Sequence, residues 1–272
     1  MLVPEDRLEV PTGVVLRDGK LEDVARGATV AVNPAAAVVL RAGGRPLREI
    51  ARDLEVAFAI DAARARDDVL RFAWQLNGLG LANVRHHHGR LWRGLQWLRL
   101  ALRLLPSATL PPSLTRRLPL DTTTSWRALA GVVRALVGRA LLLAAVAVVV
   151  LMPVAAVGGA RSLVLAGALG ASAGLALIAH ETAHALALVR ASPAAIVVSW
   201  RRISVIHAEL TPRRRTVVAA AGPLLPATFG LAIAALAVVV RLPELAVGAA
   251  PLAGHAVGLT VITSDGRRAC GI

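Results

Sequence analysis

The run His180-Glu181-Thr182-Ala183-His184 combines residue types that bind metal with one that can accept a proton. Two histidines four positions apart lie on one face of a helix, about 6 Å apart along its axis, so both rings can reach one ion. Glu181 follows one step around the helix. In this HExxH arrangement two neutral imidazoles bind zinc, and the glutamate accepts a proton from the water that attacks a carbonyl. The sequence predicts a Zn2+ site with His180 and His184 as ligands and Glu181 as the general base.

The motif continues a stretch that is expected to be buried in a membrane, because residues 162–178 are almost entirely apolar. Ionisable side chains at bilayer depth are costly and rare, so two histidines and a glutamate there need a reason to exist. The alternative is a pair of packing histidines that are hydrogen-bonded in a polar seam between helices. That alternative does not require Glu181 beside the first histidine.

The composition favours a membrane protein with a soluble part. Of the 272 residues 56% are hydrophobic and the mean hydropathy is +0.63, yet the charges are concentrated in the first half. The net charge of +14 comes almost wholly from arginines that cluster beside apolar segments, which favours a membrane surface over nucleic acid. Cys270 is the single cysteine, so no intrachain disulfide is possible. The first thirty residues are too polar for a signal peptide.

Four segments are long and apolar enough to span a bilayer, at about 140–157, 162–189, 216–240 and 245–263. The last is the weakest of these predictions because it contains Gly248, Pro251, Gly254 and His255. Arginines flank the segments unevenly, before the first, between the second and third, and after the fourth. The positive-inside rule therefore predicts an integral protein of the cytoplasmic membrane with both termini in the cytoplasm.

This topology indicates where a third metal ligand would come from. The two histidines lie near the inner end of the second span, and Asp265 directly follows the fourth. A carboxylate would complete a two-His, one-Asp zinc site with a fourth position left for water. Taken alone, Ser264-Asp265-Gly266 is also typical of a solvated turn.

The membrane half, from about residue 139 to 271, resembles the site-2 protease family of intramembrane zinc metalloproteases. The matching elements, in the family's order and spacing, are HETAH at 180–184, Ala221-Gly222-Pro223-Leu224 at the start of the third span, and Asp265-Gly266. The resemblance implies zinc bound by His180, His184 and Asp265, Glu181 as general base, substrate binding at Gly222 and Pro223, and hydrolysis of peptide bonds in or at the membrane.

Two positions depart from the family pattern and bear on substrate handling. Pro226 stands where the family usually has asparagine, and residues 261–264 replace its Asn-Pro-rich approach to Asp265.

Between the second and third spans, residues 195–200 and 203–210 are predicted to form two strands joined at Arg201 and Arg202. Such a hairpin offers an edge to an extended peptide, since a helical substrate must unwind before cleavage. His207 is interpreted as a strand residue rather than a ligand.

The N-terminal region is expected to be a small winged-helix-like module. Strands are predicted at 14–17 and 29–32, with a turn at 17–20. Asn33 is expected to cap a helix at 35–41, Pro46 to start a second helix, and Asp61 to cap a third that ends at Gly78.

This module resembles the PqqD-like domains, which recognise the leader peptides of ribosomally made, modified peptides. The residues that carry the likeness are Asn33, Gly43, Gly44, Ile50, Leu54, Asp61, Asp68, Val69, Phe72, Leu76 and Leu79. The resemblance implies that a leader peptide adds a strand beside Thr29, Val30, Ala31 and Val32 and packs against the third helix. A DNA-binding winged helix is the competing interpretation. Its recognition helix should be basic, whereas acidic residues offset the arginines here, so no nucleic-acid partner is expected.

A connector separates the two halves. Residues 91–105 form a basic amphipathic stretch that would lie on the membrane surface, or else would pack as an ordinary helix on the soluble domain. His86, His87 and His88 are interpreted as part of a solvated basic run, because consecutive side chains point in different directions.

The sequence thus predicts an α+β protein with three parts. These are a peptide-recognition domain at 1–85, a connector at 86–125, and an all-α polytopic membrane domain with a short β-hairpin at 126–272. The predicted function is that of a zinc endopeptidase that processes a precursor peptide, with the leader peptide and the lipid bilayer as partners. Two alternatives remain, a non-hydrolytic membrane docking protein for a leader peptide and a membrane-tethered winged-helix regulator.

Overall fold

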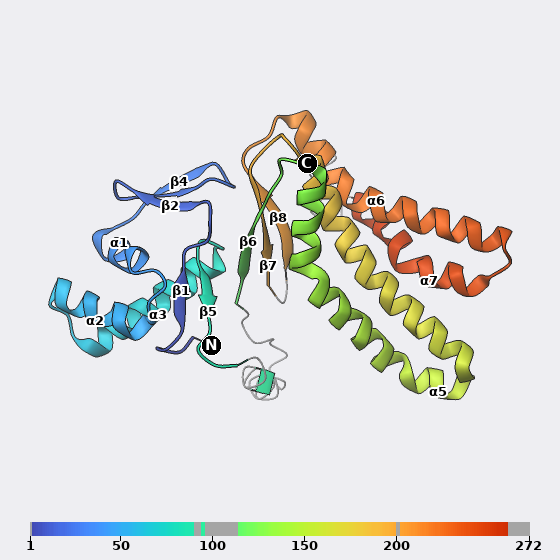
Figure 1. The fold of residues 1–272 in the computed structure, drawn as a ribbon, viewed down its shortest axis with the longest axis horizontal. Helices are drawn as coiled ribbons and strands as arrows, with labels where there is room; N and C mark the ends of the chain where they lie inside the picture. Colours follow the sequence, from blue (N-terminus) through green and yellow to red (C-terminus); the bar gives the residue numbers. More distant parts are fainter. Residues whose placement is uncertain (1, 90–93, 96–113, 200–201, 261–272) are drawn as a thin grey trace. The chain divides into compact units, whose positions relative to one another are not determined.

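The computed structural model describes residues 2–89, 94–95, 114–199 and 202–260 (Figure 1). The chain divides into two compact units. The first unit comprises residues 1–119 together with 195–208, and the second comprises residues 120–194 and 209–272. The connector stretch predicted at 91–105 falls largely outside the described residues.

A three-stranded antiparallel sheet begins the first unit. It consists of β2 (Val14–Arg17), β3 (Lys20–Asp23) and β4 (Ala28–Ala31), in that order. The loop between β2 and β3 has only two residues, Asp18 and Gly19, and both have positive φ, which matches the right-handed twist of a hairpin. The strand expected at 14–17 and its turn are confirmed, and the strand expected at 29–32 starts and ends one residue earlier.

Three helices pack beneath this sheet in the sequence order expected. They are α1 (Pro34–Arg41), α2 (Leu47–Phe58) and α3 (Ala62–Gly78). The side chain of Asn33 accepts a hydrogen bond from the amide of Ala36, and Asp61 accepts from Ala63 and Arg64, so both predicted caps satisfy amides that a helix start leaves open. Two short strands, β1 (Arg7–Glu9) and β5 (Asn83–Arg85), form a separate two-stranded antiparallel sheet in this unit.

The second sheet of this unit has the strand order β6-β7-β8, with β6 at Arg116–Leu120, β7 at Ala194–Val198 and β8 at Ile203–His207. The predicted hairpin is confirmed as β7 and β8, each shorter than expected. Reciprocal backbone hydrogen bonds between Ser199 and Arg202 close its turn. β6 was not predicted, because its sequence Arg-Arg-Leu-Pro-Leu contains a proline and gives no clear alternation.

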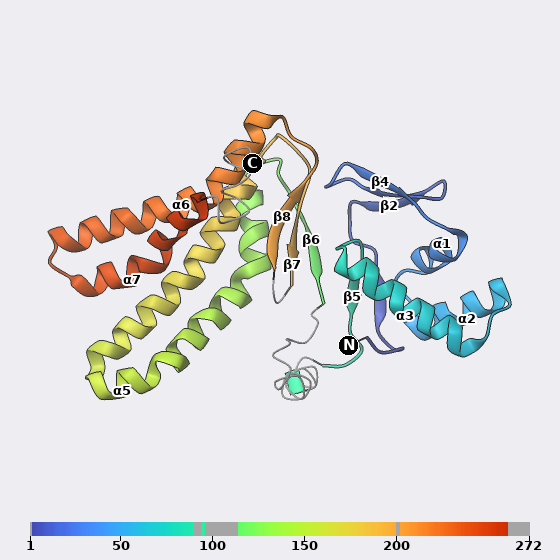
Figure 2. The ribbon, with the colours of Figure 1, turned by 180° about the vertical axis from the view of Figure 1, so that it is seen from behind.

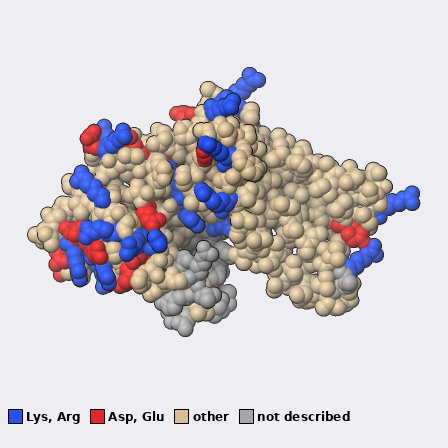
Figure 3. Space-filling view, viewed as in Figure 1, with Lys and Arg blue, Asp and Glu red and all other residues tan. Residues whose placement is uncertain are grey.

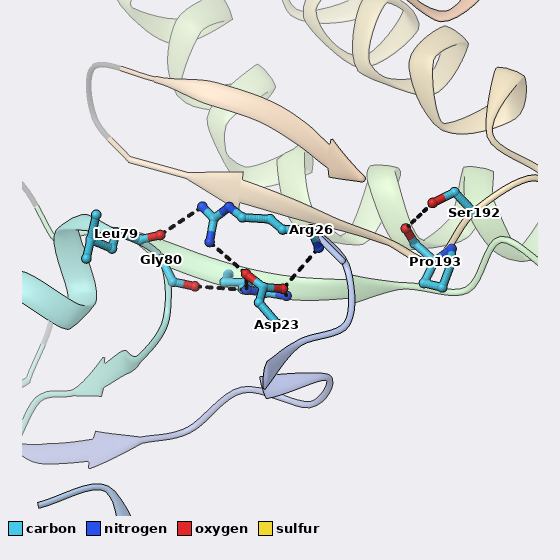
Figure 4. A network of polar contacts seen from close by, with 7 residues as sticks. Asp23, Arg26, Leu79, Gly80, Ser192 and Pro193 are labelled. Atoms are coloured by element: carbon cyan, nitrogen blue, oxygen red, sulfur yellow. Dashed lines mark hydrogen bonds and ion pairs between the residues drawn. The ribbon is translucent and has the colours of Figure 1, made fainter. Parts of the chain in front are cut away.

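A buried ion pair joins β6 to β3. The two terminal nitrogens of the Arg117 guanidinium, Nη1 and Nη2, donate to the carboxylate of Asp23 at 2.8 and 2.6 Å. Nη1 also donates to the carbonyl of Gly80. Arg26 donates to Asp23 and to the carbonyl of Leu79, so it extends the network to the end of α3 (Figure 4). This charged network therefore joins the two three-stranded sheets of the first unit.

The second unit is built from helices that could cross a membrane. α5 (Ser125–Ala187) is two helices joined at Gly159, whose φ of 71° is accessible mainly to glycine. Among the described residues three helical stretches are long and apolar enough to span, namely Ser125–Pro153, Arg161–Ala187 and α6 (Pro212–Val239). The surface over these helices carries few charges in Figure 3, in contrast to the mixed charges of the first unit.

The two arms of α5 pack closely through small residues, and the hairpin that they form is visible in both Figure 1 and Figure 2. A Cβ at Gly170 would lie 2.7 Å from the carbonyl oxygen of Ala144, and one at Gly174 would lie 2.8 Å from that of Ala140. Glycines four apart let two membrane helices approach at backbone distance, so these positions fix how the second arm lies against the first.

The fourth predicted span, at 245–263, is not confirmed as one helix. α7 (Pro243–Ala253) ends after eleven residues and continues as the 3₁₀ helix η2 (Gly254–Leu259). The change of helix type follows Pro251 and begins at Gly254, two residues that disfavour a continuous α-helix. Residues from 261 onward lie outside the described part of the chain.

Candidate metal centre

The second arm of α5 brings the two motif histidines together. The Nε2 atoms of His180 and His184 are 3.1 Å apart, and the ring centroids are 4.8 Å apart. Zinc bonds to imidazole nitrogen are about 2.0–2.1 Å long, so two tetrahedral ligands have nitrogens roughly 3.3 Å apart. The separation that one helical turn gives here is therefore close to what a shared zinc ion requires.

Helix α6 fixes the orientation of one of these rings. Nδ1 of His184 lies 2.7 Å from the carbonyl oxygen of Val218. A carbonyl only accepts hydrogen bonds, so the ring carries its hydrogen on Nδ1 and presents the lone pair of Nε2. Ligating histidines in metalloproteins are held in the same way, with the second ring nitrogen donating to a protein oxygen.

Gly222 of α6 lies directly against both rings. A Cβ at this position would be 3.0 Å from Nε2 of His180 and closer still to Nε2 and Cε1 of His184. No side chain fits there, so the glycine leaves space at the point on which the two Nε2 atoms converge. The donor set and this cradle both fit a bound zinc ion. The next residue, Pro223, is buried beside it.

Pro226 also acts on this stretch of α6. It lacks the amide hydrogen that would otherwise bond the carbonyl of Gly222 within the helix. Pro226 thus removes one helical hydrogen bond beside the predicted substrate-binding pair Gly222 and Pro223.

Glu181 is buried, with 5% of its surface exposed, in the turn of helix between the two histidines. Thr182 and Ala183 are equally buried. The glutamate is thus placed on the same helical turn as the two candidate ligands, in a helix that is long and apolar enough to span a membrane.

The predicted third ligand is not among the described residues. Asp265 lies outside them, and within the part of the chain that the structure describes no three His, Cys, Asp or Glu side chains converge as a complete metal site. The two-His, one-Asp set therefore stays a prediction for Asp265.

One residue near the site was not predicted to have a role there. The ring of His255, in η2, lies 5.4 Å from that of His180, centroid to centroid, and its Nδ1 is 2.9 Å from the carbonyl oxygen of Pro251. The only signal in the sequence is a histidine within the apolar segment predicted as the fourth span, where it counts against a continuous membrane helix.

The other histidines singled out in the sequence lie in the first unit. His207 is a strand residue, as predicted, at the end of β8, and its Nδ1 is 2.7 Å from the carbonyl of Ala208. His86 is not simply solvated, because its ring contacts Asp6 at 3.2 Å, and Asp6 is fully buried. Burial alone would raise the pKa of Asp6, but hydrogen bonds from His86 and from the amides of Val3 and His87 outweigh this and lower that pKa.

The predicted peptide-binding strand is the free edge of the first sheet. All four residues of β4 are exposed, and among the strands that the structure describes β4 pairs only with β3. The amide of Val32 donates to Gly19, so the pairs Val32–Gly19 and Val30–Leu21 are the hydrogen-bonded ones in this antiparallel ladder. The amides and carbonyls of Thr29 and Ala31 consequently point away from β3, where an added strand would meet them.

Comparison with known proteins bears on the first unit. Residues 13–82 match the family model described as "Coenzyme PQQ synthesis protein D (PqqD)". No curated protein and no solved structure matches the chain significantly. The matched region runs from the start of β2 to the residue before β5 and includes the free edge of β4. Residues 13–82 therefore form a PqqD-like domain, in a chain whose described residues also include three helices long and apolar enough to span a membrane.

Proposed function

We propose that this protein is a membrane-embedded zinc endopeptidase that cleaves a ribosomally made precursor peptide captured by its PqqD-like domain. The observation that carries the proposal is the convergence of His180 and His184 on the space left by Gly222, within an apolar helix that also bears the buried Glu181. Such a group in a membrane helix is difficult to explain by packing alone.

The chemistry assigns a separate role to each residue. His180 and His184 would hold zinc, with Asp265 as the third ligand, and the metal would supply Lewis acidity that polarises a carbonyl and acidifies water. Glu181 would accept a proton from the attacking water and deliver it to the amine that leaves. The apolar surroundings keep bulk water away from the carboxylate, and the backbone around Gly222 would align the extended substrate.

The PqqD-like domain would supply selectivity. A leader peptide that adds a strand to β4 would pair with the outward amides and carbonyls of Thr29 and Ala31. Tethering the precursor in this way raises its effective concentration at the membrane site, so the active site need not bind the cleaved segment tightly. Main-chain pairing does not depend on the sequence of the peptide, so contacts with α3 would add the selectivity for particular leader peptides.

The test combines zinc content and cleavage in one preparation. The full-length protein in lipid nanodiscs is analysed for zinc and incubated with candidate precursor peptides, and the Glu181→Gln variant is treated in parallel. We expect one zinc per chain in both proteins and cleavage only by the wild type, because glutamine cannot accept the proton but is nearly the same size. Cleavage by Glu181→Gln would contradict the mechanism, and a wild-type protein without zinc would contradict the proposed function.

A further inference from the structure

The hydrogen-bond contacts of the ring nitrogens of His180 and His184 indicate how each ring would bind zinc. Because Nδ1 of His184 donates to Val218, its Nε2 bears a lone pair, and the 3.1 Å contact requires the hydrogen to lie on Nε2 of His180. A zinc ion bound between the two Nε2 atoms would replace that hydrogen. His180 would then carry its hydrogen on Nδ1, and this N–H could donate to an acceptor within the same unit.

His255 lies where it can present such an acceptor. Its Nδ1 donates to the carbonyl of Pro251, which is one of the last four carbonyls of α7. The hydrogen of His255 is thereby fixed on Nδ1, and its Nε2 bears a lone pair. The neutral ring can accept a hydrogen bond from His180 while it donates one to the backbone.

The distance between the two rings suits this contact. Two imidazoles joined by an in-line N–H···N bond of about 2.9 Å have centroids roughly 5 Å apart, and those of His180 and His255 are 5.4 Å apart with the planes tilted by 52°. The separation of the two rings is therefore close to what such a bond requires.

The position of His255 is held by close packing on both sides. A Cβ at Gly230 would collide with the backbone of Ala253, and one at Gly258 would lie 2.8 Å from Cβ of Pro223. The segment that carries His255 is thus pressed against α6 at residues 253 and 258. The second of these contacts is at the neighbour of Gly222, so the same helix positions both His255 and the candidate metal centre.

We infer that His255 is a positioning residue for the metal centre, which accepts a hydrogen bond from Nδ1 of His180 and so fixes the orientation and basicity of this ligand. The relay runs from the carbonyl of Pro251 through His255 to His180. The inference rests on the zinc site of the proposed function, and it assigns to His255 a role that does not involve direct ligation.

The experiment measures zinc affinity rather than cleavage. Full-length wild type, His255→Leu and His255→Gln are purified in nanodiscs, and zinc is titrated in competition with a chelator. Losing the acceptor in His255→Leu should weaken zinc binding by about 10–100-fold. His255→Gln should recover most of the affinity, because its amide oxygen can accept from His180 and its amide nitrogen can donate to Pro251. His207→Leu serves as the control and should bind zinc like the wild type.

X-ray absorption of the zinc-loaded proteins separates positioning from ligation. We expect the same number of imidazole ligands in wild type and His255→Leu, with helix content and elution volume unchanged. A fall from three imidazoles in the wild type to two in His255→Leu would overturn the positioning role in favour of direct ligation. Equal zinc affinity in all variants would also overturn the positioning role, because His255 would then not affect the metal centre. Zinc binding without peptide cleavage would contradict the protease alone, whereas a wild type that binds no zinc would contradict both proposals.

Discussion

Arg117 and Asp23, 94 positions apart in the sequence, form a doubly hydrogen-bonded ion pair in which both side chains are buried. Arg117 is 1% and Asp23 is 4% exposed. This pair attaches β6, and with it the hairpin of β7 and β8, to the PqqD-like domain. The hairpin lies between two candidate membrane spans in the sequence, yet it packs with the N-terminal unit.

Replacing Arg117 by leucine should therefore loosen the first unit. Removal of one partner leaves the carboxylate of Asp23 buried with less compensation, and breaking a buried pair in this way costs about 3–5 kcal/mol. Hydrogen exchange of the amides of β3 and α3, measured by mass spectrometry on the full-length protein, should become markedly faster. Arg45→Leu removes an exposed pair with Asp53 and is the control, which should leave these amides unchanged.

The same pair predicts a loss of stability in acid. Burial alone would raise the pKa of Asp23, but Arg117 and then Arg26 outweigh it and hold this pKa below its ordinary value of 3.8. A carboxyl group with a lowered folded-state pKa contributes stability above its unfolded pKa, and the contribution is lost as the pH falls through the folded one. Thermal unfolding of the first unit should thus depend on pH below about 4. In Asp23→Asn this part of the pH dependence should disappear, and an unchanged profile would show that Asp23 does not contribute.

Gly222→Ala tests the space beside the two histidines. The added methyl would overlap the ring of His184 and crowd Nε2 of His180, so the rings must move away from the point on which they converge. We expect zinc binding to fall by at least about tenfold, since misplacing a ligand by about 1 Å disrupts a metal site. Gly167→Ala is a suitable control, because a Cβ at Gly167 meets no atom within 4 Å. Full zinc affinity in Gly222→Ala would show that this glycine does not shape the site.

Ala31→Pro tests the edge of β4. The substitution removes an amide that points away from β3, so the ladder inside the sheet should survive while pairing with a leader peptide is lost. Binding of a leader peptide to the full-length protein, followed by fluorescence anisotropy, should weaken by about tenfold. Ala31→Val keeps the amide and should bind normally. Equal binding by both variants would place the peptide elsewhere.

Features that depend on neighbouring residues were predictable from the sequence. The caps at Asn33 and Asp61, the turn at Asp18 and Gly19, and the hairpin after the second span all follow from residues within a few positions of one another. The spacing of His180 and His184 likewise fixes their separation, because one helical turn is a local geometry. Sequence therefore determined that two imidazoles and a glutamate share one turn of an apolar helix.

Tertiary structure decided what surrounds that turn. β6 exists because it pairs with a strand from a distant segment and because Arg117 reaches Asp23, and neither contact leaves a local pattern. The close approach of Gly222 to the histidines and the position of His255 beside His180 depend on how α6 and η2 pack against α5. Helix propensity and hydropathy are properties of single segments, whereas these contacts arise only when segments far apart in the chain bury their surfaces together.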